Sequence, residues 1–190
     1  MRSGARPVIS AETGRVISLL SQRVLPVTLA AVLLLAAAST RADDWRDELL
    51  LRGFADNVVR GSSLKDRPAL LQFWQSWCRS CGQLMSDLDE VAVRFPSVRY
   101  LVVSTDADPA DARRRLEAHP LLAEHPDRFF HDSTQQLATH FYVTTVPTVL
   151  VVGAGGGVRL RHSGHFNSSE LKRLVSVLAE LDSPSARNTP

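Results

Sequence analysis

The chain has 190 residues, with 22 Lys and Arg against 20 Asp and Glu, which gives a formal net charge of +2. The first 42 residues hold five Arg and one Glu, so the remaining 148 residues carry 17 basic and 19 acidic side chains. This small negative charge argues against the basic surface that a nucleic-acid-binding protein requires. A segment of 148 residues is long enough for one domain that buries its own hydrophobic core.

Residues 1–42 have the pattern of an export signal. Four arginines, from Arg2 to Arg23, precede an apolar run of 15 residues at 24–38, which is shorter than the ~20 residues of a membrane-spanning helix. Small residues follow the run up to Ala42, where we predict cleavage. An uncleaved N-terminal anchor through residues 24–38 is the alternative. Both predictions imply export to an oxidising compartment, most simply the bacterial periplasm, where disulfide chemistry persists.

The segment after the signal begins with a pattern that we interpret as a helix. The residues that recur at turn spacing within residues 43–60 are Trp45, Leu49, Leu50 and Phe54, before glycine and serine residues break the pattern. The apolar run Ala69–Trp74 then predicts a buried strand, because it is short, continuous and rich in large side chains.

A helix is predicted directly after Cys81. Its apolar residues, from Leu84 to Phe95, recur with the 3.6-residue period of one helical face, and Pro96 ends it. Residues 98–104 follow as a second buried strand.

Capping residues locate two later helices. Asp108 as N-cap and Pro109 at the first position predict a helix that ends at His119–Pro120. Asn167 and Glu170 form a capping-box pattern at the start of a closing helix. The other predicted elements are a short strand from Phe129, a helical turn or two over 135–141, a hairpin of strands 148–152 and 158–161 around a glycine-rich loop, and a frayed tail at 183–190. This order predicts a mixed α/β fold in one domain over residues 43–182.

Cys78 and Cys81 are the only cysteines and have the spacing C-x-x-C. They lie between the predicted strand at 69–74 and the helix that follows, a position that favours a redox-active thiol. A zinc site is disfavoured because no second pair of ligands with suitable spacing occurs. A plain structural disulfide is the other alternative, although so tight a loop would constrain little of the chain.

The residues around the cysteines resemble a known family. Phe73–Cys81 reads F-W-Q-S-W-C-R-S-C and is similar to the F-W-x-x-W-C-x-x-C signature of thioredoxin-like proteins. Phe141–Thr148 resembles the second signature of that fold, in which an aromatic-rich helix end leads to a cis-proline before a strand. The resemblance covers residues 60–182 and implies a thioredoxin fold, with a central mixed β-sheet flanked by helices.

An additional predicted helix within residues 105–128, together with the export signal, is similar to the TlpA/ResA/DsbE branch of exported thiol-disulfide oxidoreductases. This resemblance implies that the Cys78–Cys81 pair exchanges dithiol and disulfide with periplasmic protein partners, as a reductant. Members of that branch act on apocytochromes c and copper-site assembly proteins. It further implies an upstream membrane thiol donor, and no metal or organic cofactor.

The first cysteine, Cys78, is expected at the N-terminus of the helix and partly exposed, where backbone N–H groups favour a thiolate. Arg79 and Ser80 would stabilise that thiolate further. Cys81 would resolve the mixed disulfide formed by Cys78. Trp77 either shapes the surface that meets the partner or simply packs against the motif.

The second signature supplies the remaining expected site residues. The resemblance implies that Pro147 is cis and faces the cysteines, so that the Val146 backbone can pair with an extended partner peptide. An ordinary proline at a strand entry is the alternative.

Three positions depart from the family pattern. Gln72 stands where cytosolic thioredoxins have a buried Asp that helps to move a proton at the second thiol, and an amide cannot do acid–base work. Leu84 and Ser86 stand where branch members often have Glu and Pro. These departures weaken an assignment to the cytochrome c maturation protein itself.

Two other sets of polar residues are candidates for further sites. The six histidines are expected to be mostly solvated rather than metal-bound, and the three arginines at 113–115 to form a solvated helix face. The histidines are His119, His125, His131, His140, His162 and His165.

Three other functions stay open for the dithiol. Arg79 and Ser80 would favour the reduced form, which points towards a disulfide oxidase or isomerase. The two sulfurs could instead bind copper in a metallochaperone module, for which a Met or His close to them would be the distinguishing feature. A redox-inert interaction domain is disfavoured by the intact C-x-x-C motif.

Overall fold

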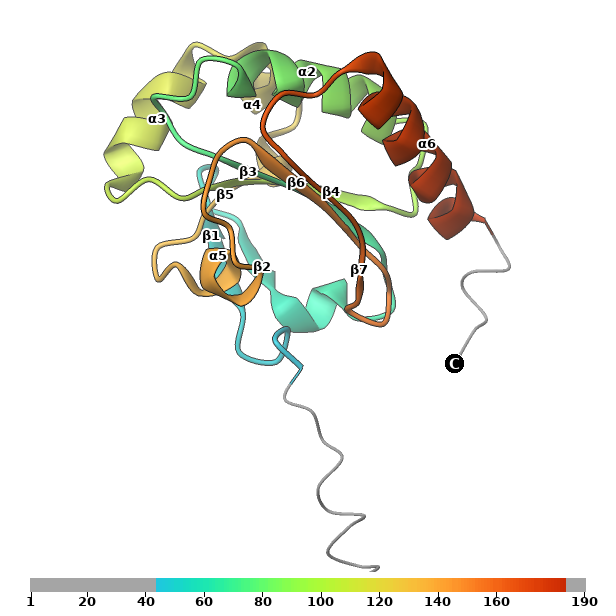
Figure 1. Cartoon of the computed structure of the whole chain (residues 1–190). Helices are drawn as coiled ribbons and strands as arrows, with labels where there is room; N and C mark the ends of the chain where they lie inside the picture. The colour runs from blue at the N-terminus through green and yellow to red at the C-terminus, as the bar shows by residue number, and fades with distance from the viewer. Residues whose placement is uncertain (1–43, 184–190) are drawn as a thin grey trace, which may run out of the picture. The chain divides into compact units, whose positions relative to one another are not determined.

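The computed structural model describes residues 44–183, which form one seven-stranded sheet with helices on both faces (Figure 1). The strands are β1 Leu50–Gly53, β2 Val58–Arg60, β3 Ala69–Trp74, β4 Arg99–Ser104, β5 Phe129–His131, β6 Thr148–Val152 and β7 Val158–Ser163. Their order across the sheet is β2-β1-β5-β4-β3-β6-β7. β4 runs parallel to β3 and β5, and all the other neighbours are antiparallel. The predicted mixed sheet is confirmed.

The helices divide between the two faces of the sheet and so enclose two separate hydrophobic cores (Figure 1). One core lies beneath the four helices α2, α3, α4 and α6, and the other lies between the sheet, α5 and the 3₁₀ turn η1. The segments are η1 Gly61–Leu64, α2 Cys81–Ala92, α3 Pro109–Glu117, α4 Pro120–Glu124, η2 Pro126–Arg128, α5 Gln136–His140 and α6 Ser168–Asp182.

Strand β3 occupies the middle of the sheet and ends at the dithiol motif. It pairs in parallel with β4 and antiparallel with β6, and all six of its side chains are buried. Alternate residues of β3 point to the two cores, with Leu70 and Trp74 on the α2 side and Leu71 and Phe73 on the α5 side. A strand covered on both faces reads as a continuous apolar run, which is why it was predictable.

The helix predicted over residues 43–60 is wrong, because this segment forms a β-hairpin of β1 and β2. Leu49 and Leu51 are buried whereas Leu50 and Arg52 are exposed, so the alternation of a strand decides the structure. Asp56 adopts a left-handed backbone with φ of 58° in the connecting turn, a conformation that Asp tolerates better than most residues.

The capping predictions are confirmed. The Asp108 carboxylate accepts a hydrogen bond from the Ala110 amide at 2.8 Å, and Asn167 forms the expected capping box with Glu170. The predicted stop at His119–Pro120 is followed by a second short helix, α4, because the His119 ring caps it by accepting from the Leu121 amide. α2 ends at Ala92, four residues before Pro96.

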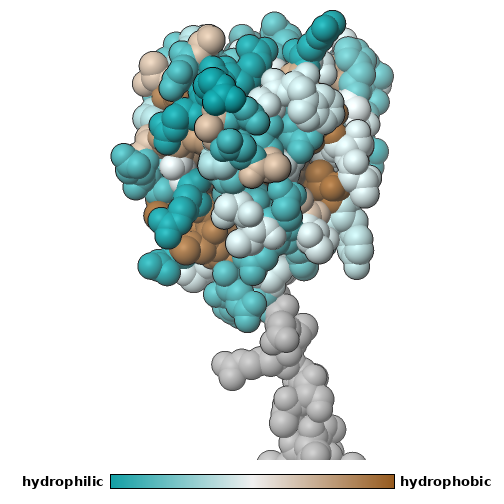
Figure 2. Space-filling model, turned by 90° about the vertical axis from the view of Figure 1, so that its left-hand side faces the viewer, coloured by the Kyte–Doolittle hydropathy of each residue, from teal (hydrophilic) through white to brown (hydrophobic). Residues whose placement is uncertain are grey.

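The surface of the domain carries its hydrophobic residues in small separate areas on one face, which is otherwise mostly hydrophilic (Figure 2). Among residues 44–183, none of the helices has the length and hydrophobicity needed to cross a bilayer. The predicted signal at 1–42 and most of the predicted tail lie outside the described residues.

Candidate active site

Cys78 and Cys81 form a disulfide at the end of β3 where the chain enters α2, with an S–S distance of 2.02 Å. Cys78 lies in a turn, closed by a hydrogen bond of 2.9 Å from its amide to the Gln75 carbonyl. Cys81 is the first residue of α2, after the N-cap Ser80. The strand-to-helix position predicted for the motif is therefore the observed one.

The exposure of the two sulfur-bearing residues differs from the prediction. Cys78 is only 6% exposed and precedes the helix by three residues, so it is neither partly open nor at the first helical position. The turn from Gln75 holds Cys78 in the core cluster that also contains Trp74. Cys81 is completely buried, so Cys78 remains the cysteine that a partner can reach.

A neutral hydrogen-bond chain lies on the sheet side of Cys81. The buried Gln72 amide donates to the Cys81 carbonyl at 3.2 Å, and its oxygen accepts from the Tyr100 hydroxyl at 2.6 Å. Burial raises the pKa of Tyr100 well above its usual value, so the phenol stays protonated and acts as a donor. Neither Gln72 nor Tyr100 can take up a proton from Cys81 at physiological pH.

Asp106 holds the turn that leads to Cys78 and is a residue that the sequence analysis missed. Its buried carboxylate accepts two hydrogen bonds of 3.0 Å from the Ser76 amide, and others from the hydroxyls of Ser76 and Ser104. The ring of His131 bonds the Asp106 carbonyl at 2.9 Å. The only sequence signal was that Asp106 comes two residues after a buried parallel strand, where polar residues often reach a site. His131 is 7% exposed, so the expectation of a solvated side chain is wrong for it.

A cavity of about 200 Å³ adjoins the motif on the side of Trp77, and the backbone segment 143–146 lines its far wall. The side-chain amides of Gln75 and Gln135 both donate hydrogen bonds to the Thr105 carbonyl, at 2.8 and 3.2 Å, and all three residues line the cavity. Trp77 is 68% exposed, so a pure packing role does not fit it. The structure thus brings Trp77 and Val146 to one cavity, although they are far apart in sequence.

Pro147 follows this cavity as a buried residue, and the Val146–Pro147 peptide bond is cis. Arg79 and Ser80 are both exposed in the C-x-x-C loop. The Ser80 hydroxyl lies 3.9 Å from the Cys78 sulfur, close enough for a weak contact.

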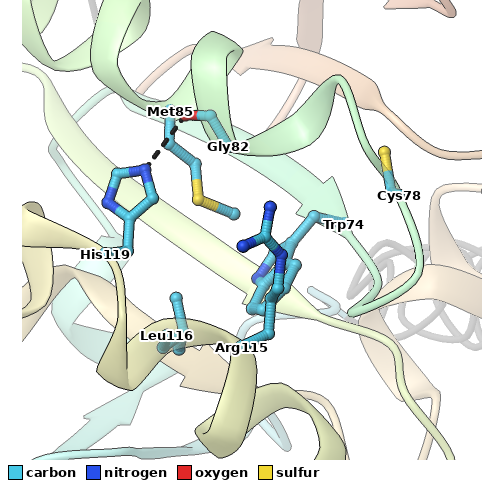
Figure 3. A pocket seen from close by; sticks show the side chains of 7 residues that line it. All are labelled: Trp74, Cys78, Gly82, Met85, Arg115, Leu116 and His119. Carbon is cyan, nitrogen blue, oxygen red and sulfur yellow. Dashed lines mark hydrogen bonds between the residues drawn. The ribbon is translucent and has the colours of Figure 1, made fainter.

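A second, much smaller pocket is lined by Cys78 and contains about 10 Å³, the space of one water molecule (Figure 3). Arg115 and His119 come to it from the inserted helical segment between β4 and β5, and Met85 comes from α2. Arg115 is exposed, as predicted for the helix face of three arginines, but it also lines this pocket, and His119 meets the motif in space although it lies far from it in sequence. The complete lining is Trp74, Cys78, Gly82, Met85, Arg115, Leu116 and His119.

Both ring nitrogens of His119 are engaged by backbone groups. Nε2 donates to the Gly82 carbonyl at 3.1 Å, and Nδ1 accepts from the Leu121 amide at 3.4 Å. This pattern describes a neutral imidazole that joins the start of α4 to the first turn of α2. Within residues 44–183, no group of three or more His, Cys, Asp or Glu side chains could hold a metal ion.

Comparisons with known proteins agree with this geometry. A sequence profile described as thioredoxin-like matches residues 66–158. The soluble secreted antigen MPT53 of Mycobacterium tuberculosis is 32% identical over 88 residues, which are 45% of this chain and 51% of that protein. The thiol:disulfide interchange protein DsbE of Xylella fastidiosa is 29% identical over 132 residues, 67% of this chain and 64% of that protein. The chain thus spans about half to two thirds of the length of these relatives.

A solved structure of a secreted disulfide oxidoreductase from Mycobacterium tuberculosis has the same fold, with a TM-score of 0.60 and 21% identity. The match covers 74% of this chain and all of that one. The chain therefore contains a thioredoxin-like domain and has the thioredoxin-like fold.

Proposed function

We propose that this protein is an exported thiol-disulfide oxidoreductase that exchanges its Cys78–Cys81 dithiol with disulfides in protein partners. The observation that carries the proposal is the pairing of the two cysteines after β3, with Cys81 fully buried and Cys78 6% exposed next to the exposed Trp77. The similarity to DsbE-type interchange proteins supports the same chemistry.

The reaction begins with the reduced protein, in which the Cys78 thiolate attacks one sulfur of a partner disulfide. A new S–S bond joins Cys78 to the partner, the partner's own S–S bond breaks, and its released thiolate takes up a proton. The Cys81 thiol then loses its proton to solvent, and its thiolate attacks the Cys78 sulfur. This step forms the intramolecular disulfide and releases the second partner thiolate, so two electrons have passed to the partner.

The oxidised protein must then be reduced again by an upstream dithiol, which we propose to be a membrane-bound thiol donor. The chemistry of both half-reactions needs only sulfur atoms and protons, so we propose no metal or organic cofactor. We place the protein in the periplasm, with residues 1–42 as the export signal. N-terminal sequencing of the protein recovered from cells should begin near Asp43, whereas an intact Met1 would favour the anchor.

The partner peptide is proposed to bind over the 200 Å³ cavity between Trp77 and Val146. The Val146 amide takes part in no hydrogen bond among the described residues, so it is free to pair with an extended chain. Trp77 and Tyr142, which are 68% and 83% exposed, offer large apolar surfaces beside the cavity. Aromatic residues of this kind often contribute most of the binding energy at protein interfaces.

The residues of the small pocket argue both for and against the copper-binding alternative. Met85 and His119 do lie on the same pocket as Cys78, the feature that would distinguish a metallochaperone. However, both nitrogens of His119 already bond backbone groups, and the cationic Arg115 shares the pocket. A positive side chain repels a metal cation, so these contacts favour thiol-disulfide exchange.

Replacing either cysteine should have different consequences. Cys78→Ser should abolish the acceleration of insulin reduction by dithiothreitol, because the attacking sulfur is lost. Cys81→Ser should accumulate a mixed disulfide with the partner, because attack still occurs but resolution does not. Non-reducing electrophoresis detects that adduct. Equal activity of Cys78→Ser and the wild type would exclude the proposed reaction.

Trp77→Ala should lower kcat/KM for a folded disulfide partner about fivefold or more, as expected for an interface aromatic. Its free energy of unfolding should stay within ~0.5 kcal/mol, because the side chain is mostly exposed. Val93→Ala is the matched control, since Val93 is 56% exposed at the opposite end of α2. A similar loss in both variants would remove Trp77 from the partner surface.

The direction of electron flow is tested by the reduction potential of the dithiol against glutathione. We expect a value near that of thioredoxin, about −270 mV, as suits a reductant. A value near that of DsbA, about −120 mV, would instead support the disulfide oxidase or isomerase.

A further inference from the structure

We infer that Arg115 is a positioning residue for the proposed reaction, which stabilises the Cys78 thiolate from the small pocket that both residues line. The inference rests on the proposed function and concerns the same dithiol. Three consecutive arginines in α3 differ in the contacts that their side chains make. Arg113 lies over the Phe54 ring at 5.7 Å, and Arg114 forms an ion pair with Asp111. Arg115 makes neither kind of contact and lines the small pocket with Cys78.

The guanidinium of Arg115 reaches across the pocket towards the first turn of α2, between Trp74 and Met85 (Figure 3). One of its nitrogens, Nη2, would lie 3.6 Å from a Cβ placed on Gly82, which is van der Waals contact. Over residues 44–183, Arg115 has no hydrogen bond or ion pair. None of the seven residues that line the pocket is acidic. The positive charge of Arg115 is therefore uncompensated in this disulfide form.

The exposed guanidinium is hydrated in the disulfide form, and it gains a favourable Coulombic interaction when a negative charge appears on the same pocket. The first turn of α2 contains no acidic residue, and the N-terminal end of a helix already carries partial positive charge. Reduction of the disulfide creates a Cys78 thiolate on the same pocket, and this anion supplies the missing partner. Arg115 therefore stabilises the reduced protein relative to the disulfide form, which carries no charge on sulfur.

The other groups that face Cys78 do not replace this charge. Arg79 is exposed to solvent, and the Ser80 hydroxyl makes only a contact of 3.9 Å with the sulfur. Both ring nitrogens of His119 are already engaged by backbone groups. Asp106 carries the opposite charge, but its carboxylate is occupied by Ser76 and Ser104 in the turn before the motif.

Arg115→Gln should raise the pKa of the Cys78 thiol and lower the reduction potential. We expect a pKa increase of ~0.5–1 unit, at the lower end of the effect of a nearby charge because Arg115 is partly solvated. The equilibrium constant with glutathione should shift about three- to tenfold towards the disulfide, which corresponds to ~15–30 mV. Thiolate absorbance against pH measures the first quantity, and redox titration of the full-length protein measures the second.

Two further variants separate position from total charge. Arg115→Lys keeps the charge and should recover most of the wild-type pKa. Arg114→Gln removes the same charge from the next residue, whose partner is Asp111, and should leave both quantities unchanged. Urea unfolding of each variant checks that the fold is intact. The Arg115→Gln shift should also shrink at high ionic strength.

An unshifted titration of Arg115→Gln would overturn the inference, as would an equal shift in Arg114→Gln. Both measurements are made on the dithiol itself and require no partner protein. A protein that fails to reduce insulin but shows the Arg115 shift would contradict the proposed function alone. A protein that reduces insulin without the shift would contradict only the role of Arg115.

Discussion

The complete burial of β3 is the constraint on which this structure depends. The strand is covered by a core on each face and paired with a strand on each edge, so its position is fixed in every direction. The two cysteines begin only four residues after it, and they inherit that fixed position. Burial on both faces also limits which polar groups the strand can carry. Its single amide, Gln72, is tolerated because Tyr100 and the Cys81 carbonyl satisfy its hydrogen-bonding groups.

The inserted segment between β4 and β5 contributes residues to the surroundings of the dithiol. α3 and α4 pack over the start of α2, where His119 ties the two regions together through the Gly82 carbonyl. The same segment delivers Arg115 to the small pocket that Cys78 lines, while Trp77 and Val146 line the larger cavity. The charge of Arg115 and the proposed partner surface thereby belong to two different pockets near one motif.

Much of this arrangement was predictable from local sequence, because the signals were strong and short-range. The apolar run of β3, the caps at Asp108 and Asn167, and the spacing of the cysteines each specify a local structure. The first hairpin was missed because its apolar residues fit both the helical period and, when Leu49 and Leu51 are weighed, the strand period. Only pairing of β1 with β5 chooses between the two.

The site residues that were missed act across long sequence distances. Asp106 reaches Ser76 over 30 residues, and Arg115 comes from a separate helix to line one pocket with Gly82 and Cys78. Nothing in the run of three arginines distinguishes Arg115 from Arg114, since the difference lies only in which way each side chain points. Residue type and spacing could locate the dithiol, but not the groups that surround it.

The hydrogen-bond chain from Cys81 through Gln72 to Tyr100 affects how the dithiol responds to pH. Gln72 does not ionise, and burial keeps the Tyr100 phenol protonated. The hydrogen-bond chain on the sheet side of Cys81 therefore carries no charge across physiological pH. The thioredoxin-type buried acid, by contrast, would make this side of Cys81 respond to acidity from within the core. Here changes in acidity and salt act on the sulfurs mainly from the solvent side, where Arg79 and Arg115 are exposed. On the sheet side of Cys81, therefore, no group of this hydrogen-bond chain changes its charge with the pH of the compartment.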